Sequence, residues 1–374
     1  MADKTTLDAN AQSRFDLINE NLAEIMNPEI IKGILAEGKN PRVYWGTACT
    51  GRPHTGYLVP AIKIAQLLAA DCQVVVLLAD IHAFLDNLKA PIELVNARAE
   101  YYRKVITALL QAVGVKTDKL EFVLGSSYQK SPEYIMDVYK LSSVTSEHDA
   151  KKAGAEIVKQ SSNAPLSGLL YSILQVLDEE YLNCDVELGG LDQRKLFAAA
   201  VDWLPKIGYR KRASVFSLAS SKIDLLDNLD VVSKKIRKAE AAPKIVEDNG
   251  LISMVEFTFL PVSSLKGKKE FRCPRKDEED LVYSDIESLK TDYANDILTP
   301  QILKAGVTAA LTELMGPIQA AFEADKEWQE INLRAYPPPE KKQKKIKDRG
   351  SRHPGAKKPE EAANEQDLPE RPKA

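Results

Sequence analysis

Short strand-like segments alternate with longer segments of helical apolar spacing in the first half of the chain. The strand-like segments occupy residues 43–45, 73–80, 120–125 and 184–188, and the segment 73–80 is almost continuously apolar. A continuous apolar run indicates a strand that is buried on both faces, and strands that alternate with helices form a parallel sheet with helices on each side. The pattern therefore predicts an α/β fold with a Rossmann-like parallel sheet.

The second half of the chain loses this alternation. Beyond about Leu226 we expect no further strands, and helical spacing covers residues 230–239, 251–259, 299–314 and 318–333. Residues 11–36, before the first strand, also have helical spacing. We predict three parts: a Rossmann-like domain over residues 1–228, a helical domain over 229–338, and a basic tail over 339–374 that is too polar to fold.

Composition excludes several classes of protein. The formal net charge of −3 argues against a uniformly basic nucleic-acid-coating protein. The four cysteines and four histidines are scattered, without a CxxC pair or a helical histidine pair, so we expect neither a disulfide framework nor a metal site. The chain starts without a signal-peptide pattern and contains no run of eighteen apolar residues, so we expect a cytoplasmic protein without a membrane span.

The turn after the first strand is a candidate nucleotide site. Residues 46–57 contain Gly46, Gly51 and Gly56 together with His54, and a helix follows them. In an open parallel sheet this turn lies at the carboxyl end of the strand, where main-chain N–H groups and a helix start attract phosphate. His54 could donate to phosphate oxygens as negative charge develops, or it could simply cap the helix; the spacing favours neither interpretation.

A polar stripe on the helix at residues 166–182 is a candidate ligand surface. Tyr171, Gln175 and Asp178 are spaced i, i+4 and i+7, so they share one face of a helix that is apolar on most other sides. A solvent-facing stripe would need no ligand. Because leucine and isoleucine surround the stripe, however, we expect it to face a pocket in which its polar groups find partners.

Three segments resemble one family. They read YWGTA followed by GRPHTGY over residues 44–57, ADIHAFLDN over 79–87, and GGLDQ over 189–193. These segments are similar to those of the class I tyrosyl-tRNA synthetases of the eukaryotic and archaeal cytoplasmic type. The segment 51–57 resembles the HIGH signature of that class, with Tyr57 in place of the second histidine. The resemblance extends over roughly residues 17–337 and implies a helical domain that recognises the anticodon region of tRNA.

The resemblance also implies roles for individual residues. It places the α-amino group of tyrosine at Tyr171 and Gln175, its phenolic hydroxyl between Tyr44 and Asp178, and the tyrosyl moiety near Gln193. It assigns ATP to Gly46, His54 and Gly56, with the ribose at Asp192. Asp192 could instead cap the helix that follows, and the two roles are compatible. The resemblance also puts His82 near the amino-acid pocket, although we prefer to interpret His82 as a core histidine with satisfied hydrogen bonds.

The reaction implied is the activation of L-tyrosine by ATP, with Mg²⁺, followed by transfer to tRNA(Tyr). A site that binds a hydroxyl group leaves its own polar groups unpaired when the hydroxyl is missing, and this family is itself the standard example of that rule. The reaction needs positioning and positive charge near the leaving pyrophosphate more than covalent help. The resemblance also implies a homodimer.

One family element is missing from the sequence. The lysine-bearing KMSKS-type loop should lie between Arg212 and the SKIDLLD segment at residues 221–227, yet only eight residues join them, and Lys222 matches the segment after the loop. A misjoined gene product, a splice form or an inactive homologue would each explain this. We therefore expect the chain to bind tyrosine better than it activates it.

Other classes of protein fit the sequence less well. A nicotinamide oxidoreductase would need a GxGxxG turn, and no such turn follows any of the predicted strands. A nucleotidyltransferase that shares the His54 loop would not explain the stripe with Tyr44. The strongest alternative is a catalytically impaired homologue that keeps tyrosine or RNA binding, which the missing loop favours.

Overall fold

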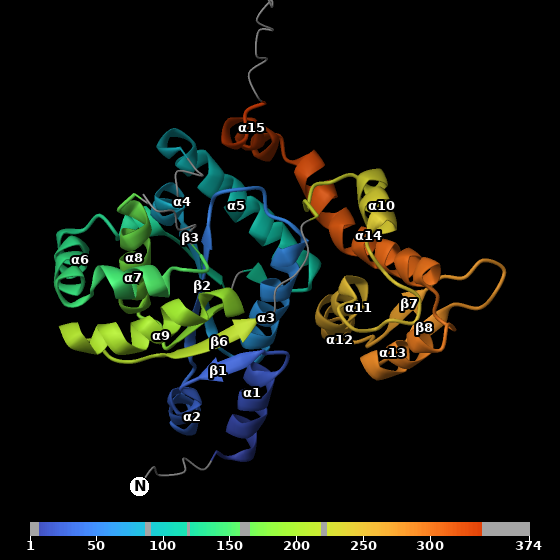
Figure 1. Ribbon diagram of the computed structural model, residues 1–374, viewed down its shortest axis with the longest axis horizontal. Helices are drawn as coiled ribbons and strands as arrows, with labels where there is room; N and C mark the ends of the chain where they lie inside the picture. The colour runs from blue at the N-terminus through green and yellow to red at the C-terminus, as the bar shows by residue number, and fades with distance from the viewer. Residues whose placement is uncertain (1–6, 87–90, 118–119, 158–164, 218–222, 339–374) are drawn as a thin grey trace, which may run out of the picture. The chain divides into compact units, whose positions relative to one another are not determined.

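A computed structural model describes residues 7–86, 91–117, 120–157, 165–217 and 223–338. The tail at residues 339–374 and Lys222 lie outside these ranges. Within them, six strands form one sheet (Figure 1): β1 (Glu24–Met26), β2 (Arg42–Ala48), β3 (Gln73–Ala79), β4 (Leu120–Leu124), β5 (Val186–Gly190) and β6 (Ala213–Ser217).

The order of the strands confirms the predicted parallel sheet. It is β1-β6-β5-β2-β3-β4, and all neighbours run parallel except β1, which pairs antiparallel with β6. The chain passes from β2 to β3 and β4 on one side and to β5 and β6 on the other. The order therefore reverses between β2 and β5, and ligands of such sheets bind in the crevice at this switch point, outside the carboxyl ends of the strands.

Helices bury both faces of the sheet because the strands alternate two apolar sets of side chains. Val74 and Val76 of β3 belong to the large core, whereas Val75 and Leu77 belong to a second cluster on the opposite face. The elements of this half of the chain are α1 (Ala9–Asn19), α2 (Pro28–Ala36), η1 (Thr55–Tyr57), α3 (Leu58–Ala69), α4 (Asp80–Leu85), α5 (Ile92–Ala112), η3 (Gly125–Ser127), α6 (Pro132–Val144), α7 (Glu147–Ala153), α8 (Ser167–Tyr181), η4 (Leu191–Gln193), α9 (Arg194–Trp203) and η5 (Leu204–Ile207).

The expected helical region at residues 11–36 is wrong in its middle. Two helices, α1 and α2, flank the short edge strand β1 instead. Asn21 and Asn27 adopt φ values of 56° and 52°, which a right-handed helix does not contain. Asparagine is among the residues that tolerate this left-handed conformation, so these two positions end and restart the helix.

The second half of the chain is mainly helical, as predicted, but it also contains a strand pair that was not expected. Its elements are α10 (Leu229–Lys238), α11 (Gly250–Met254), a π-helical turn (Val255–Phe259), α12 (Leu260–Leu265), β7 (Phe271–Cys273), β8 (Leu281–Tyr283), α13 (Ile286–Ala294), α14 (Pro300–Ala324) and α15 (Lys326–Ala335). In β7, buried Phe271 and Cys273 flank exposed Arg272. An alternation of buried and exposed residues over a strand this short is not recognisable in the sequence.

The described residues up to Pro337 belong to one compact unit. The domain boundary that we placed after residue 228 stays a prediction. None of the described helices combines the length and apolar character that a membrane crossing requires.

Candidate active site

A cavity of about 480 Å³ opens at the switch point of the sheet. Its walls come from the carboxyl ends of β2, β3 and β5, from the loop after β2 and from α8. Every residue that the sequence singled out lines it: Tyr44, Gly46, His54, Gly56, His82, Tyr171, Gln175, Asp178, Asp192 and Gln193. The structure thus brings all the predicted site residues together.

Asp178 forms the buried end of the cavity. Its Oδ1 accepts hydrogen bonds from Nε2 of Gln129 at 2.8 Å and from the hydroxyl of Tyr134 at 2.9 Å, whereas Oδ2 has no hydrogen-bond partner among the described residues. Burial raises the pKa of Asp178 to about 7. A buried carboxylate oxygen without a partner is costly unless a ligand supplies a hydrogen.

His82 lies beside Asp178, on α4. It is 2% exposed, its Nε2 is 3.6 Å from Oδ2 of Asp178, and its ring meets that of Tyr171 edge to face. Neither ring nitrogen has a hydrogen-bond partner in the described part of the chain. Our preferred interpretation of a satisfied core histidine is therefore wrong. Burial lowers the pKa of His82 to about 4, so the ring is neutral at physiological pH.

A chain of hydrogen bonds links Tyr44 to Gln193 on the cavity wall. Nε2 of Gln175 donates to Oε1 of Gln193 at 2.8 Å and to Oε1 of Glu187 at 3.1 Å. The hydroxyl of Tyr44 donates to the same Glu187 oxygen. Since both N–H groups of Gln175 are used in this way, its own Oε1 is the atom left to accept a hydrogen bond from a ligand.

Three residues of this network were missed from the sequence: Gln129, Tyr134 and Glu187. Gln129 and Tyr134 belong to a loop and a helix with no distinctive pattern around them. Glu187, by contrast, stands in the middle of a buried strand between Val186 and Leu188. A carboxyl group at the centre of an apolar strand requires a partner, and that signal was available.

The loop after β2 carries the other end of the cavity. Nδ1 of His54 accepts a hydrogen bond from the N–H of Gly56 at 3.1 Å, so His54 caps η1 and also lines the cavity. Both interpretations of this residue thus fit its position. The N–H of Thr55 donates to the carbonyl of Ile223 at 2.6 Å, and His54 forms an isolated bridge with Asp224.

Distant aromatic residues fix the same loop from outside. The hydroxyls of Tyr102 on α5 and of Tyr336 after α15 both donate to the carbonyl of Gly51 at 2.6 Å. Arg52 stacks over the ring of Tyr336 and donates to Oδ1 of Asn332 at 2.8 Å. The loop is therefore tied to segments almost three hundred residues away.

The GGLDQ turn after β5 brings Asp192 to the rim of the cavity. An added Cβ atom at Gly190 would lie 2.3 Å from Oδ1 of Asp192, so any other residue at this position would force the carboxyl group of Asp192 to move. The residue at the N-cap of α9 is Gln193, without a side-chain hydrogen bond, so Asp192 does not have the alternative capping role. Burial raises the pKa of Asp192.

The cavity has few positive groups. No lysine or arginine occurs among its described lining residues. Among the described residues there is also no group of three histidine, cysteine, aspartate or glutamate side chains that could hold a metal ion. A phosphate-bearing ligand would therefore meet main-chain N–H groups and His54 first.

Comparisons with known proteins point to one family. Residues 36–220 match the family model "tRNA synthetases class I (W and Y)". The chain is 45% identical over 388 aligned positions to the cytoplasmic tyrosine–tRNA ligase of Saccharomyces cerevisiae, covering 97% of this chain and 98% of that one. It is 47% identical over 350 positions to the cytoplasmic enzyme of Danio rerio, covering 89% of this chain but only 65% of the longer relative.

Solved structures agree with the sequence comparison. The tyrosyl-tRNA synthetase of Archaeoglobus fulgidus, solved with L-tyrosine, superposes with a TM-score of 0.76 at 29% identity, covering 83% of this chain and 99% of that one. Identity of this level over nearly the whole length of the yeast relative, together with the shared fold, means that the chain belongs to the tyrosyl-tRNA synthetases of class I.

Proposed function

We propose that this chain is a cytoplasmic tyrosine–tRNA ligase, which activates L-tyrosine with ATP to tyrosyl-adenylate and transfers the tyrosyl group to tRNA(Tyr). The observation that carries the proposal is the single cavity at the switch point. At one end of this cavity lies a buried oxygen of Asp178 that has no hydrogen-bond partner within the described ranges, and at the other end lies the His54 loop. The cavity can thus bind a hydroxyl group at one end and a nucleotide at the other.

At the amino-acid end, the phenolic hydroxyl of tyrosine donates to Oδ2 of Asp178 and meets the hydroxyl of Tyr44. The α-ammonium group donates to Oε1 of Gln175 and to the hydroxyl of Tyr171, and Gln193 contacts the tyrosyl moiety. Phenylalanine would leave Oδ2 of Asp178 buried without a hydrogen. This arrangement selects tyrosine through the cost of the unpaired oxygen.

At the nucleotide end, Gly46 and Gly56 let the adenosine moiety approach the main chain, and Asp192 accepts hydrogen bonds from the ribose. His54 donates to the phosphates as charge builds on them. The described residues form no metal site of their own, so we propose that Mg²⁺ reaches the cavity bound to the phosphates of ATP.

The missing loop limits the chemistry that we propose for this chain. Its alignment with the yeast relative runs over 388 positions, more than the 374 residues of the chain, so that relative contains residues that this chain lacks. The described cavity lining supplies no lysine in place of a KMSKS-type loop. A catalytically impaired homologue that binds tyrosine stays the second candidate.

One experiment separates the two candidates. Tyrosine binding is measured by calorimetry, and tyrosine-dependent exchange of pyrophosphate into ATP is measured in this chain and in one with a KMSKS-type loop inserted before Ser221. We expect equal tyrosine affinity in both chains and exchange that is faster by about 10²–10³ in the second, the usual effect of restoring a group that stabilises developing charge. If neither chain exchanges pyrophosphate, the ligase proposal fails.

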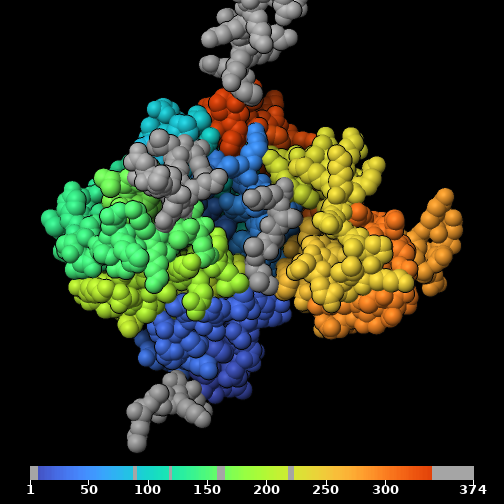
Figure 2. Space-filling view, in the orientation of Figure 1, coloured from blue at the N-terminus to red at the C-terminus, as the bar shows by residue number. Residues whose placement is uncertain are grey.

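We also propose that the chain forms a homodimer through α6. This helix lies on the outside of the molecule, at the left of Figures 1 and 2, and it exposes Ile135, Met136, Tyr139 and Val144. Exposed apolar residues along one helix are typical of an interface. Light scattering should give a dimer for this chain and a monomer for Met136→Lys; a monomeric starting chain would contradict the proposal.

A further inference from the structure

His82 is a buried side chain of the cavity to which the proposed function gives no role. It lies on α4, directly after the carboxyl end of β3, is 2% exposed and lines the cavity. Neither of its ring nitrogens has a hydrogen-bond partner among the residues that the structure describes. An imidazole ring carries at least one N–H group whether it is neutral or protonated. His82 therefore has a hydrogen to donate to a ligand.

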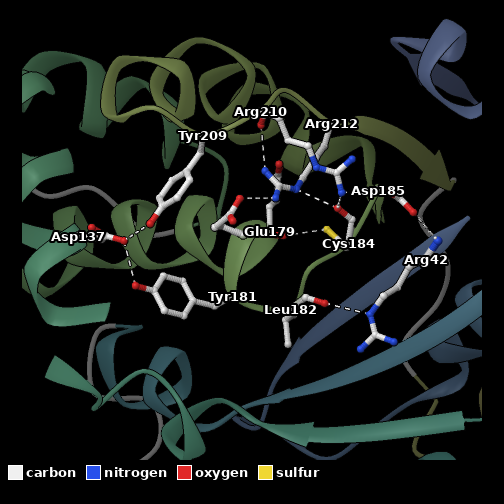
Figure 3. Close-up of polar contacts among 11 residues, drawn as sticks. Arg42, Asp137, Glu179, Tyr181, Leu182, Cys184, Asp185, Tyr209, Arg210 and Arg212 are labelled. Atoms are coloured by element: carbon white, nitrogen blue, oxygen red, sulfur yellow. Dashed lines mark hydrogen bonds and ion pairs between the residues drawn. The ribbon is translucent and has the colours of Figure 1, made fainter. Parts of the chain in front are cut away.

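Two other deeply buried polar side chains in the same half of the chain do have partners within the protein (Figure 3). Arg212 is 1% exposed, and its Nε donates to a main-chain carbonyl at 2.9 Å. Asp137 is 4% exposed and accepts hydrogen bonds from the hydroxyls of two tyrosines. Burying a polar group without a partner is costly, and these two side chains avoid that cost. In the described part of the chain, His82 and Oδ2 of Asp178 do not avoid it, and both residues line the same cavity.

The two groups without partners lie side by side. Nε2 of His82 is 3.6 Å from Oδ2 of Asp178, which is too long for a direct hydrogen bond. An oxygen atom at an ordinary distance of about 2.7–3.0 Å from both atoms fits this separation. Because Oδ2 of the carboxylate is an acceptor, its position favours the ring tautomer with the hydrogen on Nε2. One bound hydroxyl group can therefore donate to Oδ2 and accept from Nε2–H.

A count of the hydrogens in the pocket leaves this role to His82. In the proposed complex the phenol of tyrosine gives its only hydrogen to Asp178, so its oxygen is left to accept. Tyr44, the other group proposed at the phenol, has one hydroxyl hydrogen, which Glu187 accepts in this structure. Gln175 donates both of its N–H groups to protein oxygens. The hydrogen on Nε2 of His82, by contrast, is not taken by any described residue.

We propose that His82 is a specificity-determining residue, which donates the hydrogen of its Nε2 to the phenol oxygen of tyrosine. The inference rests on the proposed tyrosine pocket and deepens it. The pocket then binds the hydroxyl group twice, once as a donor at Asp178 and once as an acceptor at His82. Phenylalanine forms neither hydrogen bond and leaves both buried groups unpaired. The preference for tyrosine is therefore shared between two residues.

The test compares the affinities for tyrosine and phenylalanine by calorimetry, which needs no catalysis. His82→Leu removes the donor, so the preference for tyrosine over phenylalanine should fall about tenfold, the effect of one lost hydrogen bond in a buried site. A loss of packing weakens both amino acids alike, and the ratio of the two affinities cancels it. Tyr181→Phe is the matched control, because it removes a hydroxyl that donates to Asp137 outside the cavity and should leave the ratio unchanged.

Two further variants identify the nitrogen that donates. The side-chain amide of glutamine reaches the position of Nε2, whereas that of asparagine reaches only the position of Nδ1. His82→Gln should therefore keep most of the preference for tyrosine, and His82→Asn should lose it as His82→Leu does. Equal losses of tyrosine and phenylalanine affinity in His82→Leu, or a His82→Gln variant no more selective than His82→Leu, would overturn the inference and leave the tyrosine pocket intact.

Tyr44→Phe separates His82 from the other candidate donor. If the hydroxyl of Tyr44 supplied the hydrogen to the phenol oxygen, Tyr44→Phe would cause the whole loss of preference and His82→Leu would cause none. That result would also contradict the inference. An unmodified chain that does not prefer tyrosine to phenylalanine would instead overturn the proposed function, and this inference with it.

Discussion

At the amino-acid end of the cavity Asp178 and His82 are almost fully buried, whereas at the nucleotide end His54 and Gly56 are half-buried. The buried end holds polar atoms without a hydrogen-bond partner in the part of the chain that the structure describes, namely Oδ2 of Asp178 and both ring nitrogens of His82. The nucleotide end is instead a loop whose main-chain groups are tied to distant segments. At the amino-acid end, selectivity thus comes from polar atoms whose hydrogen bonds a ligand must complete. At the nucleotide end, hydrogen bonds within the protein fix the shape of the loop.

The largest expected effect is a loss of ligand affinity at the amino-acid end alone. Asp178→Asn replaces a charged acceptor with a neutral amide, so tyrosine affinity should fall about a hundredfold, as for the loss of a hydrogen bond to a charged group. ATP affinity should not change. Asp137→Asn is the matched control, because Asp137 is also buried and accepts from Tyr181 at 2.9 Å but does not line the cavity. Calorimetry with each ligand distinguishes the two variants.

The same substitution should make the free protein more stable. The pKa of Asp178 is raised to about 7 in the folded chain, so between about pH 4 and 7 the folded state binds more protons than the unfolded state, and stability falls as pH rises through that range. Asp178→Asn removes this loss, on the order of a few kcal/mol above pH 7. Urea unfolding at acidic and alkaline pH measures it; an unchanged pH dependence would show that Asp178 is ionised without cost.

A smaller loss of ligand affinity is expected at the nucleotide end. Oγ1 of Thr55 accepts a hydrogen bond from the N–H of Ile223 at 3.3 Å. Thr55→Val keeps the shape and removes that acceptor, so the KM for ATP should rise about fivefold, as for one lost hydrogen bond. Pyrophosphate exchange in the loop-restored chain measures it, with tyrosine affinity as the control. A change in tyrosine affinity would mean that the two ends are not independent.

The smallest effect concerns the outer support of the loop. Tyr336→Phe removes one of the two hydroxyls that donate to Gly51 but keeps the ring over which Arg52 stacks. Since Tyr102 still donates, the KM for ATP should rise only about twofold. The double variant with Tyr102→Phe should cost more than the sum of the single changes, because the carbonyl then loses both partners.

The contrast between the ends also explains what could be read from the sequence. The helix stripe, the strand runs and the glycine turn are local patterns, and they predicted the sheet, the turn with His54 and the stripe of Tyr171, Gln175 and Asp178. Tyr44, His82, Asp192 and Gln193 were named only through the family resemblance. Gln129 and the Gly51 contacts depend on which segments meet across the fold, and no local spacing encodes that. Glu187 was missed although its place between Val186 and Leu188 was a local signal. Asn21 and Asn27 ended a helix by their backbone conformation rather than by a break in apolar spacing, so the edge strand β1 was missed.

The hydrogen bond from Tyr336 to Gly51 has a consequence for the order in which the chain becomes functional. The two residues are 285 positions apart, and synthesis at about 5–20 residues per second separates them by tens of seconds. The sheet and the amino-acid end, complete by β6, can fold during that interval. The nucleotide loop receives its last support only when residue 336 emerges, so a nascent chain would recognise tyrosine before its ATP loop is fully secured.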